Sequence, residues 1–217
     1  MGKSGLLTDE LRAQLKTIFS KLNQEVRLIA VLASEDTKSK ELTDLLQDFA
    51  ETSPFLALEI YETEQAKDWD EKLDTKHLPL VALFDKNQTY TGVCFHGVPG
   101  GKELNSFVAA IANCGGAGQA PDKFLKKSID SIKTPRNIKV FVSLACHHCP
   151  HVVAACNKIA FLNSNVEAHM YDANLYPDLV ADYKIERVPM MVVNDSNTIY
   201  GKKSIEEIAN LLNMIKN

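Results

Sequence analysis

The order of residue patterns in the first half of this chain occurs a second time in its second half. Each half begins with apolar residues at helical spacing, continues with a compact apolar run of strand length, and then shows a second helical pattern and a second strand pattern. In each half a proline, Pro79 and then Pro189, precedes a third apolar run. A chain of 217 residues that repeats in this way is predicted to fold as two similar units, each long enough to bury its own core.

The periodicity of the apolar residues places the elements of each unit. In the first half we expect helices and strands, in chain order, at residues 8–22, 25–33, 37–51, 55–61, 80–84, 89–95 and 102–113, with a turn or short helix around Trp69. In the second half we expect the corresponding elements at residues 122–132, 137–145, 147–162, 166–171, 190–193, 198–201 and 204–215. The glycine-rich residues 115–118 are typical of a linker, so the predicted units cover residues 1–117 and 118–217.

A helix, then strand, helix and strand, then a hairpin and a closing helix is the order of elements in the thioredoxin fold. The predicted fold class is therefore α/β, with two tandem thioredoxin folds whose mixed sheets are flanked by helices on both faces and can fuse into one continuous sheet. The prolines at matching places, Pro79 and Pro189, are expected to follow cis peptide bonds. The alternative is that each proline simply begins a strand.

One short motif carries recognisable chemistry, Cys146-His147-His148-Cys149-Pro150, at the start of a predicted helix. The unpaired backbone N–H groups and the positive end of the helix dipole favour a thiolate at this place. A thiolate there can attack a disulfide, and a second thiol one helical turn away can resolve the mixed disulfide. We therefore predict that Cys146 is the nucleophile and that Cys149 is the buried resolving thiol.

The two residues between the cysteines, His147 and His148, would add positive charge when protonated. Our hypothesis is that they stabilise the reduced form, so the redox potential of His148→Ala should fall. The alternative for a Cys-x-x-Cys sequence is half of a zinc site, to which His147, His148 and His151 could add ligands. No second Cys-x-x-Cys or His-x3-His pattern occurs elsewhere in the sequence, so we expect no metal and no cofactor other than a redox-active Cys146–Cys149 disulfide.

Aligning the two halves places Ser34 and Thr37 where the second half has Cys146 and Cys149. Hydroxyl groups cannot perform thiol chemistry, so the first unit is predicted to keep the fold and to be redox-silent. The remaining cysteines and histidines show no pattern that indicates partners, and we interpret them as core or surface residues: Cys94, Cys114, Cys156, His77, His96 and His169.

The charge balance excludes two classes of partner. With 24 basic and 28 acidic residues the net charge is −4, which gives no field to attract nucleic acid or an anionic membrane surface. No stretch reaches the length of a membrane span, and the first residues lack the apolar run of a secretory signal. Together with five cysteines, an odd number, this predicts a protein of the reducing cytoplasm.

The residues around the motif also resemble a known family. The chain resembles the N-terminal domain of the flavoprotein subunit of alkyl hydroperoxide reductase, most specifically in residues 143–153, which include Cys146 and Cys149, and in the later Val188-Pro189. The likeness extends from about Leu11 to the C-terminus. In that family the domain is two fused thioredoxin folds, with the Cys-x-x-Cys only in the second.

The resemblance implies two partners for the chain. It would accept electrons from the flavin-linked dithiol of a thioredoxin-reductase-like flavoprotein and reduce the disulfide of a peroxiredoxin, with His147, His148, Val188 and Pro189 next to the bound partner. The family's flavin and nicotinamide domains have no counterpart here, because the sequence contains no G-x-G-x-x-G. Flavin and nicotinamide are therefore expected only in a separate or missing reductase part.

The resemblance also implies a proton acceptor for the resolving thiol. Many thioredoxins bury an acid six residues before the first cysteine, where this chain has Val140. The matching glutamate by resemblance is Glu103, and our hypothesis is that it reaches Cys149 across the interface between the units. The alternative is that Glu103 is an ordinary acid that stabilises the start of a helix.

The sequence therefore predicts a dithiol–disulfide oxidoreductase that relays electrons from a flavoprotein reductase to a peroxiredoxin in an alkyl hydroperoxide reductase system. Two alternatives stay open at this point. One is a general protein disulfide oxidoreductase, although such two-domain relatives usually carry Cys-x-x-Cys in both halves. The other is a non-catalytic module that binds zinc or a partner.

Overall fold

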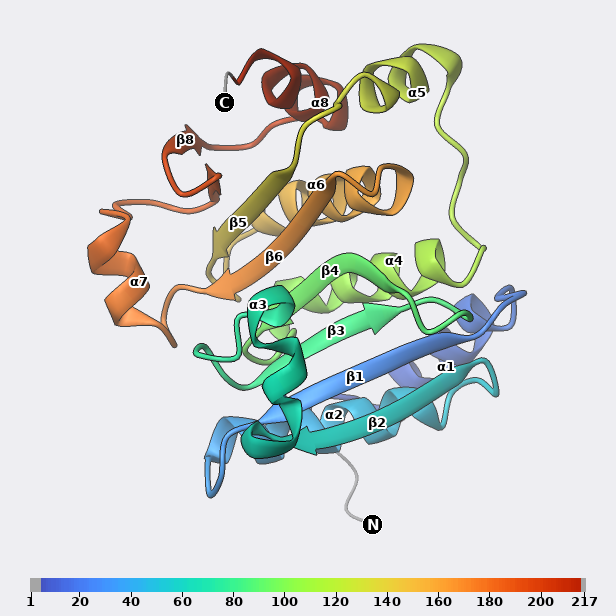
Figure 1. Ribbon diagram of the computed structural model, residues 1–217. Coiled ribbons are helices and arrows are strands. Elements are labelled where there is room, and N and C mark those ends of the chain that lie inside the picture. The colour runs from blue at the N-terminus through green and yellow to red at the C-terminus, as the bar shows by residue number, and fades with distance from the viewer. Residues whose placement is uncertain (1–4, 216–217) are drawn as a thin grey trace.

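Eight strands lie edge to edge in a single mixed sheet (Figure 1). The computed structural model describes residues 5–215, without the side chains at positions 67, 68, 70 and 71. From one edge of the sheet to the other, the strands are β2 (Leu56–Glu62), β1 (Val26–Leu32), β3 (Leu80–Phe84), β4 (Tyr90–His96), β6 (Val166–Asp172), β5 (Arg136–Val142), β7 (Met190–Val193) and β8 (Asn197–Tyr200).

The two halves of this sheet have the same strand order. Strand β1 pairs in parallel with β2 and antiparallel with β3, and β5 pairs in the same way with β6 and β7. The halves are joined by β4 and β6, which pair in parallel with Cys94 opposite His169 and His96 opposite Tyr171. Two thioredoxin folds therefore follow one another head to tail, and the predicted fold class and fused sheet are confirmed.

The longer helices pack on one face of the sheet around a single hydrophobic core. These helices are α1 (Asp9–Phe19), α2 (Thr37–Ala50), α4 (Leu104–Cys114), α5 (Lys123–Asp130), α6 (Cys149–Leu162) and α8 (Ile205–Met214). Alternate residues of each strand point into this core because successive strand side chains face opposite sides. Three buried rings from α1, α2 and α4 pack in series at tilted angles, with 6.0 Å between the centroids of Phe19 and Phe49 and 5.1 Å between those of Phe49 and Phe107. Truncating such a ring to alanine typically costs about 3–5 kcal/mol.

The opposite face is covered by shorter segments. In the first half they are the 3-10 helix η1 (Thr63–Trp69) and helix α3 (Asp70–Leu73), and in the second half helix α7 (Pro177–Asp182). In Figure 1, α3 lies in front of the sheet and α7 lies at the left, beside the ends of β5 and β6. Each packs on its own small apolar cluster. The short helix expected around Trp69 is thus present. Helix α7 was not predicted, because six residues with only Leu179 buried leave little periodicity in the sequence.

The helix that matters most for the chemistry begins later than predicted. The expected helix over 147–162 starts at Cys149, with His148 as its N-cap and Pro150 in its first turn, so Cys146 and His147 lie in the preceding loop. Both predicted cis peptide bonds are present, at Leu78-Pro79 and Val188-Pro189.

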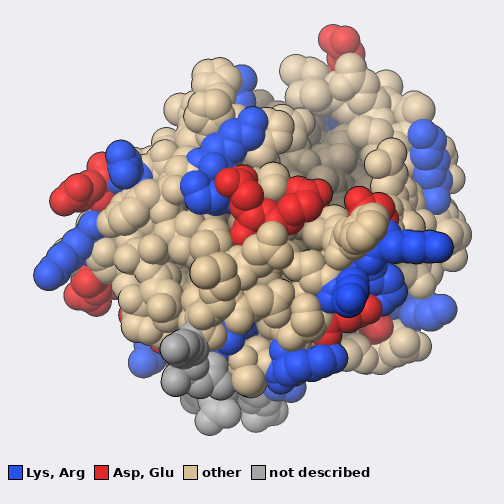
Figure 2. All heavy atoms as spheres, turned by 90° about the horizontal axis from the view of Figure 1, so that it is seen from above, with Lys and Arg blue, Asp and Glu red and all other residues tan. Residues whose placement is uncertain are grey.

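Charged side chains of both signs are interspersed on the face shown in Figure 2. Neither sign forms an extended patch in that view, which agrees with the near balance of charge in the sequence. Among the helices of residues 5–215, none combines the length and the apolar character needed to cross a membrane.

Candidate active site

The loop between β5 and α6 holds the two cysteines of the motif. After β5 ends at Val142, the Cys146 N–H donates to the Ser143 carbonyl at 2.9 Å and closes a turn. Cys146 and Cys149 are joined in a disulfide with 5.5 Å between their Cα atoms. The Cys146 side chain is partly exposed, whereas Cys149 is fully buried. Of the two sulfurs, Cys146 Sγ is therefore the more accessible to an incoming thiol.

At the N-terminus of α6, a backbone N–H group points at the sulfur of Cys146. The N-cap residue His148 makes no side-chain capping bond, and the Cys149 N–H donates to Cys146 Sγ at 3.2 Å. The positive end of the helix dipole lies at the same place. Both effects stabilise negative charge on Cys146 when the disulfide is reduced.

The matching position in the first half is built differently. Helix α2 is capped by Asp36, whose carboxylate accepts from the Ser39 N–H at 2.7 Å, and the Ser39 hydroxyl accepts from the Ala33 N–H at 3.0 Å. Ser34 and Thr37, which align with the cysteines, are exposed. An ordinary oxygen cap thus stands at the start of α2, where α6 has Cys146 Sγ next to its first N–H group.

Pro189 lies beside the end of β5 from which the active-site loop departs. Strand β7 pairs antiparallel with β5, with Met190 opposite Phe141. Pro189, one residue before Met190, therefore lies at the level of Val142. Pro189 is buried, and Val188 is half-buried against the same core that Cys146 and Cys149 contact.

A cleft of about 300 Å³ lies next to the disulfide, between α4 and the first turns of α6. It is lined by Lys102, Asn105, Ser106, His147, Pro150, His151 and Ala154. His147 and His148 are both exposed, and of the two only His147 lines this cleft. The residues on its walls come from both halves of the chain.

Glu103 lies at the end of η2 (Gly101–Glu103), which comes immediately before α4. The Lys102 N–H donates to the carbonyl of Leu144 at 2.8 Å, two residues before Cys146. Gly101 has a φ of +53°, and a Cβ there would lie 2.6 Å from the same Leu144 oxygen. The close approach of these two backbones requires glycine and fixes η2 against the active-site loop.

The side chain of Glu103 is completely buried. One carboxylate oxygen accepts a very short hydrogen bond from the Ser106 hydroxyl, and the other, Oε1, has no partner within the described part of the chain. Burial raises the pKa of Glu103 to about 7; the Asp172 carboxylate adds to this rise, and the hydrogen bond from Ser106 opposes it. A carboxyl group with this pKa can both take up and release a proton near neutral pH.

The other three cysteines, Cys94, Cys114 and Cys156, are buried free thiols, as expected. The Cys156 thiol donates to Met191 Sδ at 3.6 Å, and burial raises the pKa of Cys156 to about 12. Val140, at the position of the usual thioredoxin acid, is buried in the same core and pairs with Met191. Cys156 is therefore a core residue rather than a third reactive thiol.

The histidines that were interpreted without partners make a connected network at the junction of the halves. His77 lies between Asp74 Oδ2, 2.9 Å from its Nδ1, and Asp178 Oδ2, 3.2 Å from its Nε2. His96 and His169 are buried next to one another, with 3.2 Å between His96 Nε2 and His169 Nδ1. No sequence pattern indicates the contact between His96 and His169, because it arises from the pairing of β4 with β6.

Comparisons with known proteins agree with this geometry. A model of the family described as "Thioredoxin domain" matches residues 136–213. The N-terminal domain of alkyl hydroperoxide reductase AhpF from Enterococcus faecalis superposes with a TM-score of 0.90 at 39% identity, over 95% of this chain and 99% of that structure. A protein disulfide oxidoreductase from Aeropyrum pernix superposes with a TM-score of 0.84 at 20% identity, over 95% of this chain and 92% of the other, and shares the fold.

Among curated proteins, the alkyl hydroperoxide reductase AhpF of Staphylococcus aureus is 30% identical over 209 residues. That match covers 95% of this chain but 38% of the relative's length. The chain therefore spans a little over one third of the curated proteins that it matches.

A Cys-x-x-Cys disulfide at the N-terminus of a helix in a thioredoxin fold defines a thiol–disulfide oxidoreductase. The two cysteines lie in the second of two fused thioredoxin folds, which is also the region that matches the thioredoxin-domain family. The chain belongs to the family of AhpF N-terminal domains.

Proposed function

We propose that this chain relays two electrons at a time from a flavin-linked dithiol to the disulfide of a peroxiredoxin. The observation that carries the proposal is the Cys146–Cys149 disulfide, with the attacking sulfur partly exposed at a helix N-terminus and the resolving sulfur buried. The membership in the AhpF family supports the choice of donor and acceptor. The chain works in the cytoplasm, where thiols are kept reduced.

The transfer proceeds by two exchanges at sulfur. The Cys146 thiolate attacks one sulfur of the peroxiredoxin disulfide; a mixed disulfide forms and the other peroxiredoxin sulfur leaves as a thiolate. Cys149 then loses its proton and attacks Cys146 Sγ, which forms the Cys146–Cys149 disulfide and releases the second peroxiredoxin sulfur. Two electrons have passed to the peroxiredoxin. A flavin-linked dithiol restores the reduced pair by the same exchange in reverse.

Glu103 accepts the proton that Cys149 must lose. Three observations support this role: Glu103 is fully buried, its Oε1 has no partner among the described residues, and its element is bonded to the loop that carries Cys146. The pKa of about 7 suits exchange of a proton with a thiol. The redox-silent half, residues 1–117, would in this way contribute one group to the chemistry of residues 118–217.

The peroxiredoxin binds across the exposed side of the disulfide. His147, His148 and the Val188-Pro189 segment would contact the partner on either side of Cys146, and the cleft between α4 and α6 would receive the chain next to the partner's cysteine. Flavin and nicotinamide belong to the reductase that feeds this chain, whether separate or attached.

A coupled turnover assay tests the relay. The chain is combined with a thioredoxin-reductase-like flavoprotein, a peroxiredoxin, a hydroperoxide and reduced nicotinamide, and nicotinamide oxidation is followed. We expect turnover that depends on every component and disappears in Cys146→Ser. Insulin reduction without peroxiredoxin turnover would identify a general disulfide oxidoreductase instead.

The role of Glu103 is tested by the pH dependence of disulfide exchange in Glu103→Gln. If Glu103 takes the proton, the resolution step in the variant loses its inflection near pH 7 and becomes slower, while formation of the mixed disulfide by Cys146 is retained. An unchanged pH profile would assign Glu103 to helix stabilisation alone.

A further inference from the structure

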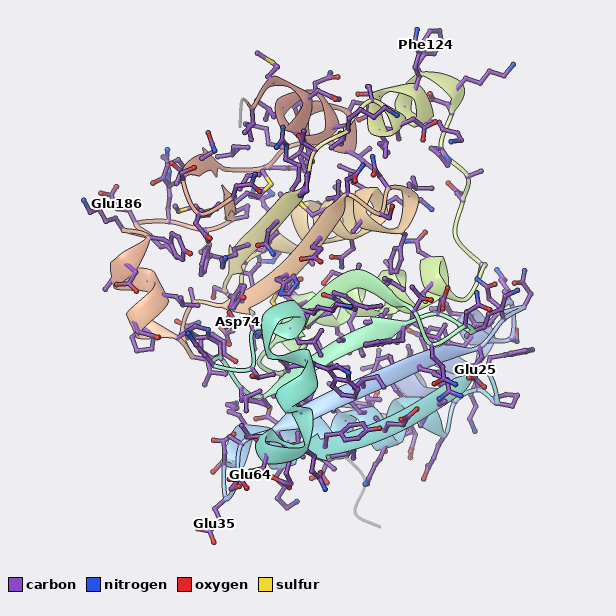
Figure 3. All side chains as sticks on the ribbon, viewed as in Figure 1. Glu25, Glu35, Glu64, Asp74, Phe124 and Glu186 are labelled. Atoms are coloured by element: carbon purple, nitrogen blue, oxygen red, sulfur yellow. A yellow bond between two sulfur atoms is a disulfide. The ribbon has the colours of Figure 1, made fainter. Side chains whose placement is uncertain are left out.

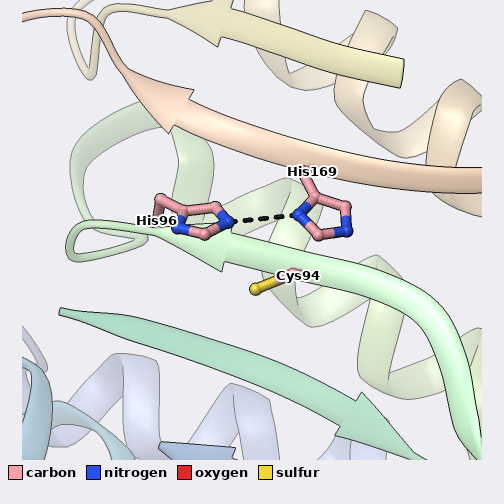
Figure 4. Close-up of side chains that lie close together, drawn as sticks. All are labelled: Cys94, His96 and His169. Carbon is pink, nitrogen blue, oxygen red and sulfur yellow. Dashed lines mark hydrogen bonds between the residues drawn. The ribbon is translucent and has the colours of Figure 1, made fainter. Parts of the chain in front are cut away.

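Three buried side chains with metal-binding atoms meet where the two halves of the sheet join. Cys94 Sγ and ring nitrogens of His96 and His169 all lie within 4.8 Å of one another. All three side chains are at most 2% exposed. Figure 4 shows His96 and His169 facing one another across the β4–β6 junction, with Cys94 beside them.

The fold brings these residues together from distant parts of the chain. Cys94 and His96 are two residues apart on β4, so they point to the same face of the sheet. The parallel pairing of β4 with β6 sets His169 directly opposite Cys94.

The outer nitrogens of both rings already have partners. His96 Nδ1 lies 2.8 Å from the carbonyl of His77 and donates to it, and His169 Nε2 lies 3.0 Å from the Tyr90 hydroxyl. This leaves His96 Nε2 and His169 Nδ1 facing one another at 3.2 Å. Metal-binding histidines typically use their other nitrogen in this way to fix the ring.

We propose that Cys94, His96 and His169 form a three-coordinate site for Cu⁺. Two metal–nitrogen bonds of about 2.0 Å at trigonal or tetrahedral angles hold their nitrogens about 3.3–3.5 Å apart, close to the observed separation of 3.2 Å. The thiolate is a soft donor that selects Cu⁺ or Zn²⁺, and imidazole binds both of these metals.

Charge favours the monovalent ion. Cu⁺ bound by one thiolate and two neutral imidazoles forms an electrically neutral complex, whereas Zn²⁺ bound by the same three ligands would keep one positive charge and would require a fourth ligand. The nearby carboxylate of Asp74, labelled in Figure 3, already accepts from the Tyr171 hydroxyl at 2.7 Å and lies 2.9 Å from His77 Nδ1. It is therefore engaged elsewhere and does not complete a four-ligand zinc site.

An approach to the site exists from the surface. His169 lines a polar cavity of about 420 Å³ together with Asp74, His77, Tyr171 and Lys139. The ammonium group of Lys139 is paired with Asp195 at 2.5 Å, which offsets its repulsion of a cation. The Cys94 thiol releases its proton to solvent as Cu⁺ takes its place. The copper stays Cu⁺, and no electron is transferred.

The binding test uses the full chain carrying Cys146→Ser and Cys149→Ser, so that the redox pair cannot hold the metal. Under anaerobic reducing conditions, Cu⁺ is titrated against a chromogenic Cu⁺ chelator. We expect one Cu⁺ per chain and a thiolate-to-copper absorption band in the ultraviolet. Adding Cys94→Ser should remove the band, and adding Cys94→Ser or His169→Asn should weaken binding at least tenfold, with near-ultraviolet circular dichroism used to confirm folding.

The matched control is Cys114→Ser in the same background, because Cys114 is also a buried free thiol but lies outside the cluster. This variant should bind Cu⁺ unchanged. The proposal is overturned if the background protein binds no Cu⁺, if both cluster variants bind it normally, or if Zn²⁺ displaces Cu⁺ at equal concentration. Because the redox cysteines are absent, the outcome does not depend on the electron relay.

Discussion

Replacing the buried Glu103 by glutamine should change how the stability of the protein depends on pH. The pKa of this group rises from 4.5 in the unfolded chain to about 7 in the folded one, mainly through burial. Between these values the unfolded chain has released a proton that the folded chain keeps, so the free energy of unfolding falls as the pH rises. This difference in pKa corresponds to a contribution of about 3 kcal/mol to the free energy of unfolding at low pH. The contribution is fully lost once the pH has passed the folded-state pKa. Glutamine keeps the shape of the side chain and has no proton to release.

The measurement is urea denaturation of the oxidised protein at pH 4.5 and pH 8, for wild type and Glu103→Gln. The difference between the two proteins in free energy of unfolding, taken at each pH, cancels the contributions of the other titrating groups. This difference should shift in favour of the variant by up to about 3 kcal/mol on going to pH 8. The exposed Glu186, labelled in Figure 3, provides the control Glu186→Gln, which should follow wild type at both values. If Glu103→Gln and wild type lose stability in parallel, the carboxyl group is not buried in the way described.

Three further substitutions test separate parts of the structure. Cys149→Ser should halt the exchange at a mixed disulfide on Cys146, seen on a non-reducing gel, whereas Cys146→Ser should form none; equal trapping in both would reverse their roles. Gly101→Ala should destabilise the protein by at least about 1 kcal/mol more than Gly201→Ala in thermal denaturation, because both have positive φ but only Gly101 approaches the Leu144 oxygen; equal losses would contradict this. Asp48→Asn should cost about 3 kcal/mol in urea denaturation, since it removes the buried carboxylate that pairs closely with the half-buried Arg12 and leaves Arg12 with Asp9, 4.0 Å away. Asp44→Asn, which breaks an exposed pair with Lys40, should cost less than about 1 kcal/mol, and similar losses for both would refute the distinction.

Local patterns were sufficient to predict the fold. The elements of each half follow from apolar periodicity, and the repeat of one order of elements around Pro79 and Pro189 identifies two thioredoxin units. Cys146 and Cys149 could be assigned their positions because both lie in one short motif whose chemistry depends on a helix N-terminus. These are features that a few neighbouring residues determine.

Contacts between distant segments could not be predicted in this way. The contact between His96 and His169, which completes the histidine network, depends on the parallel pairing of β4 with β6. The sequence of neither strand indicates which strand of the other half it will pair with. The burial of Glu103 likewise results from the fixed position of η2 against the Leu144 loop, which Gly101 permits. Short helix α7 was missed because its packing depends on the sheet beneath it.

A stoichiometric transfer experiment tests most directly whether the Cys146–Cys149 pair carries electrons to a peroxiredoxin. The chain is reduced, freed of reductant and mixed with an excess of oxidised peroxiredoxin, and thiols are then counted and disulfides mapped by mass spectrometry. The expected result is one peroxiredoxin disulfide reduced per chain, with Cys146 and Cys149 oxidised and Cys94, Cys114 and Cys156 still free. Reduction of the peroxiredoxin by a chain that carries Cys146→Ser, or no reduction by the unaltered chain, would contradict the relay.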